Sequence, residues 1–278
     1  MVYLLAVSLL WAFSFGLTKG LTAGLDGTFV AAARLGLALL VFLPFLRRRN
    51  LTARTAAALA AIGAVQFGVM YLAYNASFAT LPAYQVALFT LTTPILVTLI
   101  ADAWERRWRW RALVAALLAV IGTALVVFQS GVPGGTLRGI LWVQLSNIAF
   151  AIGQVAYQRL RARQPELRDR EIFALLYAGA FALAVAVMCT RGFSVTLTGK
   201  QALTLVYLGT IASGLGFFLW NLGATKVNAG TLAVMNNGKV PLAIACSLIF
   251  FGESANLIRL AGSLALLGVA LWIAREPR

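Results

Sequence analysis

The chain has 278 residues, of which 61% are hydrophobic and 11% are charged, and its mean hydropathy is +0.88. This composition is typical of a polytopic membrane protein and excludes an ordinary water-soluble globular domain. The sequence contains no His, which excludes His-based metal sites, triads and proton relays. Cys189 and Cys246 lie in apolar runs without a redox or zinc pattern, so neither a metal nor a cofactor is expected.

Ten apolar segments follow one another along the chain, and each is long enough to cross a bilayer. About 20 apolar residues in a helix span the hydrocarbon core of about 30 Å. The segments lie at about 2–19, 29–46, 56–78, 83–101, 112–128, 137–158, 172–190, 201–222, 228–251 and 257–274. Because no segment alternates in polarity as a barrel strand does, the expected fold is an all-α polytopic membrane protein with ten transmembrane helices.

The basic residues predict the orientation of these helices. With the N-terminus inside, sixteen of the 23 Lys and Arg residues lie in inner segments and five in outer ones, whereas Arg34 and Lys239 lie within spans. This bias follows the positive-inside rule, so both termini are expected in the cytoplasm. The net charge of +15 then reflects topology and contact with membrane lipids, and no nucleic-acid partner is expected. No span carries a deep carboxylate of the kind that proton or sodium pumps use.

The two halves of the chain resemble each other. Segment 114–125 aligns with 260–271. Matched landmarks in the same order are Gly122 with Gly268 and Pro94 with Pro241. Each half has five spans, and an odd number places the halves in opposite orientations. We therefore expect two inverted five-helix repeats, over residues 1–130 and 136–275, with the substrate near the midplane between them.

The ninth span is apolar except for Lys239 at its middle. A lysine at the bilayer centre costs about 2.5–3.5 kcal/mol on insertion scales, so water, a carboxylate or a bound anion has to offset it. Asn236 shares its helical face, and Pro241 cannot complete the helical hydrogen bond. We expect Lys239 to bind an anionic group of a substrate, Asn236 to orient that group, and the helices to break or hinge at Pro94 and Pro241. The alternative is a neutral buried amine bonded to freed carbonyls.

Polar residues at helical spacing predict the rest of the cavity lining. In the sixth span Gln144, Asn147 and Gln154 share one face; the alternative is that these amides only join helices. The remaining candidates for substrate binding are Trp11, Ser14, Tyr71, Asn75, Thr92 and Phe217. Arg34 lies only about five residues into the second span, so we expect it to snorkel to the membrane surface.

The order of several short motifs resembles that of a known family. Trp11-Ala12 followed by Ser14 in the first span, a Pro in the fourth and ninth spans, and Phe251-Gly252-Glu253 before the tenth are similar to the EamA-type transporters of the drug/metabolite transporter superfamily. The resemblance covers essentially the whole chain. It implies a bacterial inner-membrane carrier, often an exporter of amino acids or related metabolites, and the aromatic amino acid exporters are one branch. It assigns no role to the lysine of the ninth span.

The residues and the resemblance together predict a secondary transporter, an exporter, that moves small metabolites by alternating access. Amino acids or other carboxylate-bearing solutes are the first candidates, and facilitated export of amines, nucleosides or drugs is the alternative. An enzyme is not expected, because only a Ser–Lys pair of Ser14 and Lys239 would remain for catalysis. A scaffold without transport would use the polar stripes as helix–helix contacts. Coupling stays open between facilitated diffusion and protons carried by Lys239.

Overall fold

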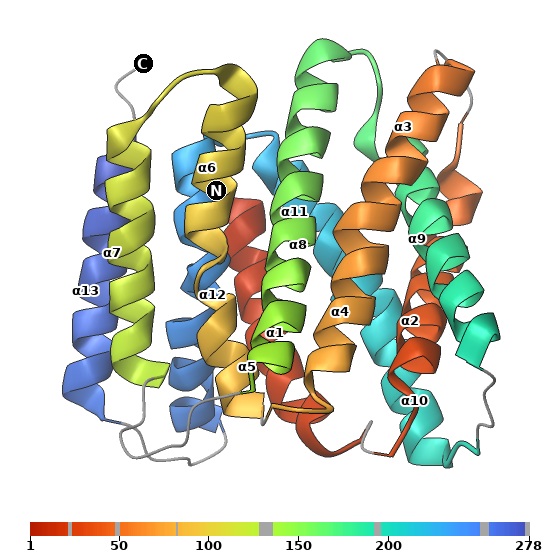
Figure 1. Ribbon diagram of the computed structural model, residues 1–278, viewed down its shortest axis with the longest axis horizontal. Coiled ribbons are helices and arrows are strands. Elements are labelled where there is room, and N and C mark those ends of the chain that lie inside the picture. Colours follow the sequence, from red (N-terminus) through yellow and green to blue (C-terminus); the bar gives the residue numbers. More distant parts are fainter. Residues whose placement is uncertain are drawn as a thin grey trace.

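The computed structural model describes residues 1–21, 24–47, 51–81, 83–127, 136–191, 196–250 and 256–275, with side chains except at 12–21, 83–84, 191, 243–244 and 246–250. The described part of the chain is a bundle of helices without a strand (Figure 1). The first half comprises α1 (Val2–Leu21), α2 (Gly27–Phe42) with the 3-10 turn η1 (Leu43–Phe45), α3 (Ala53–Gly63), η2 (Ala64–Val69), α4 (Met70–Ser77), α5 (Ala83–Thr90), α6 (Thr93–Glu105) and α7 (Trp110–Val127). The second half comprises α8 (Leu137–Arg163), α9 (Asp169–Arg191), α10 (Gly199–Tyr207), η3 (Leu208–Leu215), α11 (Gly216–Ala224), α12 (Ala229–Phe250) and α13 (Leu257–Ala274).

Eight helical stretches in the described residues are long and apolar enough to cross a membrane. They are 27–45, 53–77, 85–105, 110–127, 137–163, 169–190, 199–224 and 257–274. The other two predicted spans coincide with α1 and α12, which have 20 and 22 residues but are described only in part at the level of side chains. A polytopic membrane protein is therefore the observed fold class, and the count of ten spans stays a prediction.

Polar caps begin the helices where the chain turns between spans. The side chains of Asp26, Thr52, Thr136 and Asn256 accept hydrogen bonds from backbone N–H groups of the first turns of α2, α3, α8 and α13. Thr198 forms a capping box with a glutamine three residues later at the start of α10. These caps satisfy N–H groups that have no partner within the helix, which keeps the helix ends at defined positions.

Two spans contain a π-helical segment at matching places in the two halves. η2 interrupts the third span between α3 and α4, and η3 interrupts the eighth span between α10 and α11. Both segments contain buried glycines, Gly68 in η2 and Gly209 and Gly214 in η3, and these lie against α9 and α2 respectively. Extra residues in a π turn leave carbonyls without the usual helical donor, and such segments are frequent at functional sites.

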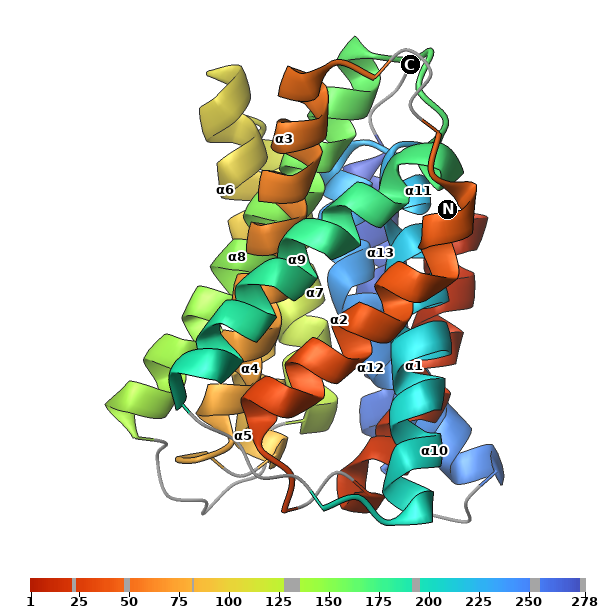
Figure 2. The same cartoon turned by 90° about the vertical axis from the view of Figure 1, so that its right-hand side faces the viewer.

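The two halves interlock, and their contacts come in reciprocal pairs. The third span, with α3 and η2, packs on α9, while η3 of the eighth span packs on α2. Likewise α4 packs on α8 and α11 packs on α1, and α7 pairs with α13 at one edge of the bundle (Figure 1). The start of α1 and the end of α13 lie toward the same end of the bundle as the α6–α7 and α8–α9 connections (Figures 1 and 2).

The backbones of α3 and α9 approach each other without intervening side chains. A methyl group added at Gly63 would lie 1.9 Å from the carbonyl oxygen of Leu176, and one at Gly179 would lie 2.0 Å from that of Ala60. In a bilayer, helices associate through such close packing of small residues because lipid is as apolar as their side chains. This contact fixes the first half of the chain to the second.

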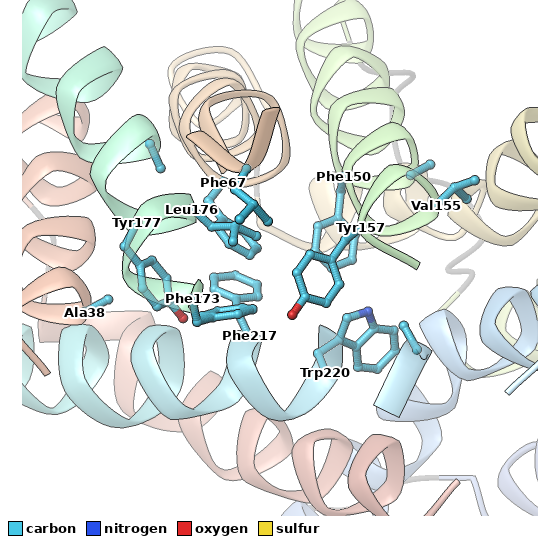
Figure 3. Close-up of a cluster of buried hydrophobic side chains, with 14 of the residues drawn as sticks. Ala38, Phe67, Phe150, Val155, Tyr157, Phe173, Leu176, Tyr177, Phe217 and Trp220 are labelled. Carbon is cyan, nitrogen blue, oxygen red and sulfur yellow. The ribbon is translucent and has the colours of Figure 1, made fainter. Parts of the chain in front are cut away.

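Aromatic side chains from both halves fill the centre of the bundle (Figure 3). Phe67 and Tyr177 stack with ring centroids 5.5 Å apart, and Phe173 meets Tyr177 edge-on at 5.2 Å. Figure 3 also shows Phe150, Phe217 and Trp220 facing the same space. The core is thus built where the spans cross, and it places the polar side chains described next around a ring-lined centre.

Candidate functional site

Five aromatic side chains form a continuous series of ring contacts, here called the aromatic strip: Tyr71, Phe67, Phe217, Trp11 and Trp220. Phe217 stacks on Phe67 at 4.6 Å and meets Tyr71 edge-on at 5.8 Å. Trp11 meets Phe217 at 5.3 Å and stacks on Trp220 at 5.3 Å. The strip draws on α1, the third span and the eighth span, so Trp11, Tyr71 and Phe217, three predicted site residues, do lie together.

Lys239 lies beside this strip. Its Nζ is 5.2 Å from the ring centroid of Trp11, a cation–π distance, and its side chain is half-buried. It has no carboxylate partner among the residues that the structure describes. The ring of Trp11 presents its electron-rich face to Lys239, but it cannot replace an anion as a counterion.

A pair of buried amides continues from the strip. Trp220 donates from Nε1 to Gln154 Oε1 at 3.0 Å. Gln154 and Asn236 exchange hydrogen bonds of 3.4 and 3.3 Å, and Asn236 also donates to the carbonyl of Leu232 at 2.8 Å. Asn236 is thereby fixed one turn of α12 before Lys239. The predicted residues Gln154, Asn236 and Lys239 thus line one region with the aromatic strip.

A second cation lies at the Tyr71 end of the strip. The guanidinium carbon of Arg34 is 4.6 Å from the ring centroid of Tyr71, and Arg34 Nε donates to Ser213 Oγ at 3.0 Å. The Tyr71 hydroxyl lies 2.9 Å from the same Ser213 Oγ. We expected Arg34 to snorkel outward; it instead points toward η3 and the strip. Arg34 is close enough to the end of α2 to snorkel. The direction of its side chain is nevertheless decided by the rotation of α2 about its axis, which packing on α9 sets.

Three predicted site residues form hydrogen bonds around an interruption of the fourth span, between the end of α5 and the start of α6. α5 ends at Thr90, which leaves the carbonyl of Phe89 without a helical donor. Gln144 and Asn147 both donate to that carbonyl, at 3.2 and 2.9 Å, and Thr92 donates to Gln144 Oε1 at 2.9 Å. The structure therefore brings these polar groups together around freed backbone, which favours the helix-joining alternative for them.

Only one of the two predicted prolines lies at an interruption of a helix. Pro94 lies in the first turn of α6, directly after the break. The break or hinge expected at Pro241 differs from the structure, because α12 continues as a helix on both sides of it. Asn237, which the sequence analysis did not select, donates to the carbonyl of Leu91 at 2.9 Å and so ties α12 to the break.

One further predicted residue, Asn75, lies elsewhere. Asn75 donates to the carbonyl of Gly27 at 2.7 Å and so fastens α4 to the start of α2, away from Lys239. The side chain of Ser14 lies outside the described residues, as does the motif at 251–253. Gln66 and Asn221, which the predicted site did not include, exchange hydrogen bonds of 2.8 and 3.1 Å and so join the two halves.

The chain is similar over its full length to curated bacterial proteins. It is 42% identical over 282 residues to a protein of Pseudomonas aeruginosa named probable biotin transporter, covering 100% of this chain and 98% of the relative. It is 41% identical to the biotin transporter of Escherichia coli K12, covering 99% and 93%. It is also similar to a protein of Streptantibioticus cattleyicolor named probable terminal-alkyne amino-acid exporter, at 24% identity over 94% of this chain and 89% of the relative.

A solved crystal structure has the same fold, with a TM-score of 0.78 at 18% identity, covering 98% of this chain and 95% of that one. The sequence profile of the EamA-like transporter family matches twice, over residues 1–128 and 137–275. These matches identify a membrane transporter and not an enzyme. The chain therefore belongs to the EamA-like transporter family.

Proposed function

We propose that the protein is a secondary transporter of biotin or of a closely similar carboxylate-bearing solute. The observation that carries this proposal is Lys239, a half-buried cation beside an aromatic strip with no carboxylate partner among the described residues. A carboxylate is the group that completes such a site, because a buried charge is stable only when it is paired. The names of the relatives at about 40% identity support biotin as the solute.

The other groups around Lys239 suit the rest of such a molecule. Biotin combines a carboxylate with an apolar chain and a ring system that carries a cyclic urea. The aromatic strip offers rings for the apolar part, and the amides of Gln154 and Asn236 offer both donors and acceptors for the urea. In this arrangement the carboxylate binds to Lys239.

The transport cycle that we propose uses the two halves of the chain as inverted repeats, with ten spans in the inner membrane and both termini in the cytoplasm. The double match of the family profile, the reciprocal packing of the halves and the two π-helical segments at matching places support the repeats. Rocking of such halves about a midplane site exposes it alternately to either side. Lys239 and the strip lie where the two halves meet.

The test is flux of labelled biotin in proteoliposomes with Lys239→Met and, as a matched control, Lys226→Met, which removes an exposed lysine outside the site. Loss of one partner of a buried charge pair, here Lys239 and the substrate carboxylate, costs about 2–5 kcal/mol of binding free energy. Uptake at low substrate concentration should therefore fall at least about thirtyfold in Lys239→Met and stay unchanged in Lys226→Met. Biotin methyl ester should not compete, because it lacks the carboxylate. Equal flux in both variants would contradict the proposal, and a pH-gradient arm separates facilitated diffusion from proton carriage by Lys239.

An amino acid is the second candidate substrate, and the similarity to an amino-acid exporter favours it. An amino acid offers the same carboxylate to Lys239 and an apolar side chain to the aromatic strip. The same proteoliposomes loaded with labelled aromatic and aliphatic amino acids distinguish the two. Export of amino acids without biotin flux would assign the site to them.

A further inference from the structure

A groove of about 640 Å³ opens between α3, α6 and α8. Figures 1 and 2 show that these helices end beside one another at the end of the bundle that holds the α6–α7 and α8–α9 connections. None of its lining residues belongs to the aromatic strip. Its mouth carries three arginines, Arg54 of α3 and Arg159 and Arg163 of α8. The groove is therefore separate from the aromatic strip and carries a concentrated positive charge at its mouth.

The arginines have capacity for a further acceptor. Arg54 and Arg163 are exposed and have no ion-pair partner among the described residues. Arg159 contacts Glu105 with Nη2 to Oε1 at 3.0 Å and lies over the ring of Trp104 at 5.4 Å. Its Nε is nevertheless buried without a hydrogen-bond partner. Glu105 contacts only Arg159 of the three groove arginines and also pairs with Arg109, with Nη1 to Oε2 at 2.9 Å. The mouth is therefore net positive and has an unsatisfied donor.

Below the arginines the groove is apolar. Ala58, Ala61 and Ile62 follow Arg54 along the same face of α3 at helical spacing, and Ala156 and Leu160 of α8 line the opposite wall. From residue 54 to residue 62 the helix rises about 12 Å, so the apolar wall leads from the arginines toward the centre of the bundle. Charge at the end of the span and an apolar wall toward its middle match a lipid, with its phosphate at the surface and its acyl chain inward.

Hydrogen bonds between polar side chains join the two walls of the groove at its arginine end. Gln164 donates from Nε2 to Thr55 Oγ1 at 3.1 Å, which joins the end of α8 to the start of α3. Thr52 caps α3 beside Arg54 and bonds to the same Thr55 hydroxyl at 3.0 Å. The two walls are therefore held together at the mouth, so the groove has a fixed width where a headgroup would bind.

We propose that this groove is a binding site for one anionic phospholipid, with its phosphate on Arg54, Arg159 and Arg163 and an acyl chain along Ala61 and Leu160. The charge complementarity selects an anionic headgroup, and the apolar wall selects a lipid over a free anion. A zwitterionic lipid would leave the excess charge of the three arginines uncompensated. The bound lipid would span α3 and α8, and so contact both halves of the transporter.

The experiment is a titration of the purified, delipidated protein with phosphatidylglycerol, followed by native mass spectrometry. The test variant is Arg54→Gln with Arg163→Gln. The control is Arg107→Gln with Arg170→Gln, which removes two exposed arginines from the same end of the bundle but outside the groove. Each cation near an anionic lipid contributes about a fivefold change in affinity, so the test variant should bind phosphatidylglycerol about thirtyfold more weakly than the control.

Three arms decide between occupants. Phosphatidylcholine should bind much more weakly than phosphatidylglycerol, and neither inorganic phosphate nor biotin should displace the bound lipid. Equal weakening by the two double variants would overturn the proposal, since it would show attraction by total charge alone. Displacement by phosphate would assign the groove to a free anion, and displacement by biotin would assign it to the transport path; either result overturns the lipid site.

Discussion

Two cations flank the aromatic strip, and neither has an acidic partner among the described residues. Lys239 lies over Trp11, next to the Trp220 end of the strip, and Arg34 lies over Tyr71 at the other end. Cation–π contact contributes about 0.5–2 kcal/mol per pair, which is less than the cost of an unpaired charge within a bilayer. The difference favours occupancy of the strip by a solute with an acceptor group for each end.

Arg34→Gln should weaken this second anchor without unfolding the chain, because glutamine can still donate to Ser213. A hydrogen bond to a charged group contributes about 1.5–3 kcal/mol, so the KM for biotin should rise about tenfold or more. The measurement is initial flux against biotin concentration in proteoliposomes. Arg138→Gln, a change at an exposed arginine at the start of α8, serves as the control and should leave the KM unchanged. An unchanged KM in Arg34→Gln would leave Lys239 as the single charged anchor.

Single residues also show how much of the candidate site could be predicted from the sequence. Lys239, Asn236 and Gln154 could be selected because an ionised or amide group in an apolar run is costly and therefore informative. Arg34 was misread because its depth is visible in the sequence but its direction is not. Gln144 and Asn147 were found as a polar face, yet the group they serve, the carbonyl of Phe89, is freed only by a break that one sequence does not locate.

At the scale of helices, predicted spans and observed helices agree closely, because a bilayer fixes both the length and the apolarity of a span. Interruptions within spans were harder to predict. One proline accompanies a break and the other does not, since Pro94 stands in the first turn of α6 whereas α12 passes through Pro241. The π-helical segments η2 and η3 left no residue signal beyond their glycines, because they arise from packing against α9 and α2.

Gly63→Ala should destabilise the pairing of α3 with α9. The new methyl group would meet the backbone of Leu176, which cannot move aside as a side chain can, so the two helices have to separate. Overpacking of this kind costs about 1–3 kcal/mol, and we expect a value at the upper end. Thermal unfolding in detergent, followed by tryptophan fluorescence, measures the change.

Gly268→Ala is the matched control, because nothing lies within 4 Å of a methyl group added there. Alanine has the higher helix propensity, so this variant should be as stable as the parent or slightly more stable. Equal loss of stability in both variants would show that close contact with α9 is not the reason for Gly63. The comparison separates the effect of helix packing on stability from the effect of helix propensity.

At the scale of the whole molecule, the arrangement of charge predicts which end faces the cytoplasm. The α6–α7 and α8–α9 connections, the start of α1 and the end of α13 lie toward one end of the bundle (Figure 1), as the positive-inside bias requires. The predicted sidedness follows from the distribution of Lys and Arg. The two-repeat organisation stays a prediction, supported by internal similarity and reciprocal packing.

Cysteine labelling tests the sidedness. In a variant with both native cysteines replaced by alanine, Arg107→Cys lies in the α6–α7 connection and Arg138→Cys lies at the start of α8, at the opposite end of the bundle. A membrane-impermeant maleimide should label Arg138→Cys in intact spheroplasts and Arg107→Cys only after lysis. The reverse pattern would invert the topology, and labelling of both in intact cells would indicate two orientations.

The close contact of Gly63 with α9 has a consequence for how the protein is made. Roughly 110 residues separate the two partners in the chain, and a ribosome adds about 5–20 residues per second, so α3 waits about 5–20 s in the membrane before α9 is synthesised. During that time the glycine face of α3 has only lipid, or the small-residue faces of other nascent helices, to pack against. The first half therefore enters the bilayer as an incomplete body, and the late arrival of α9 is the step that commits it to the native pairing.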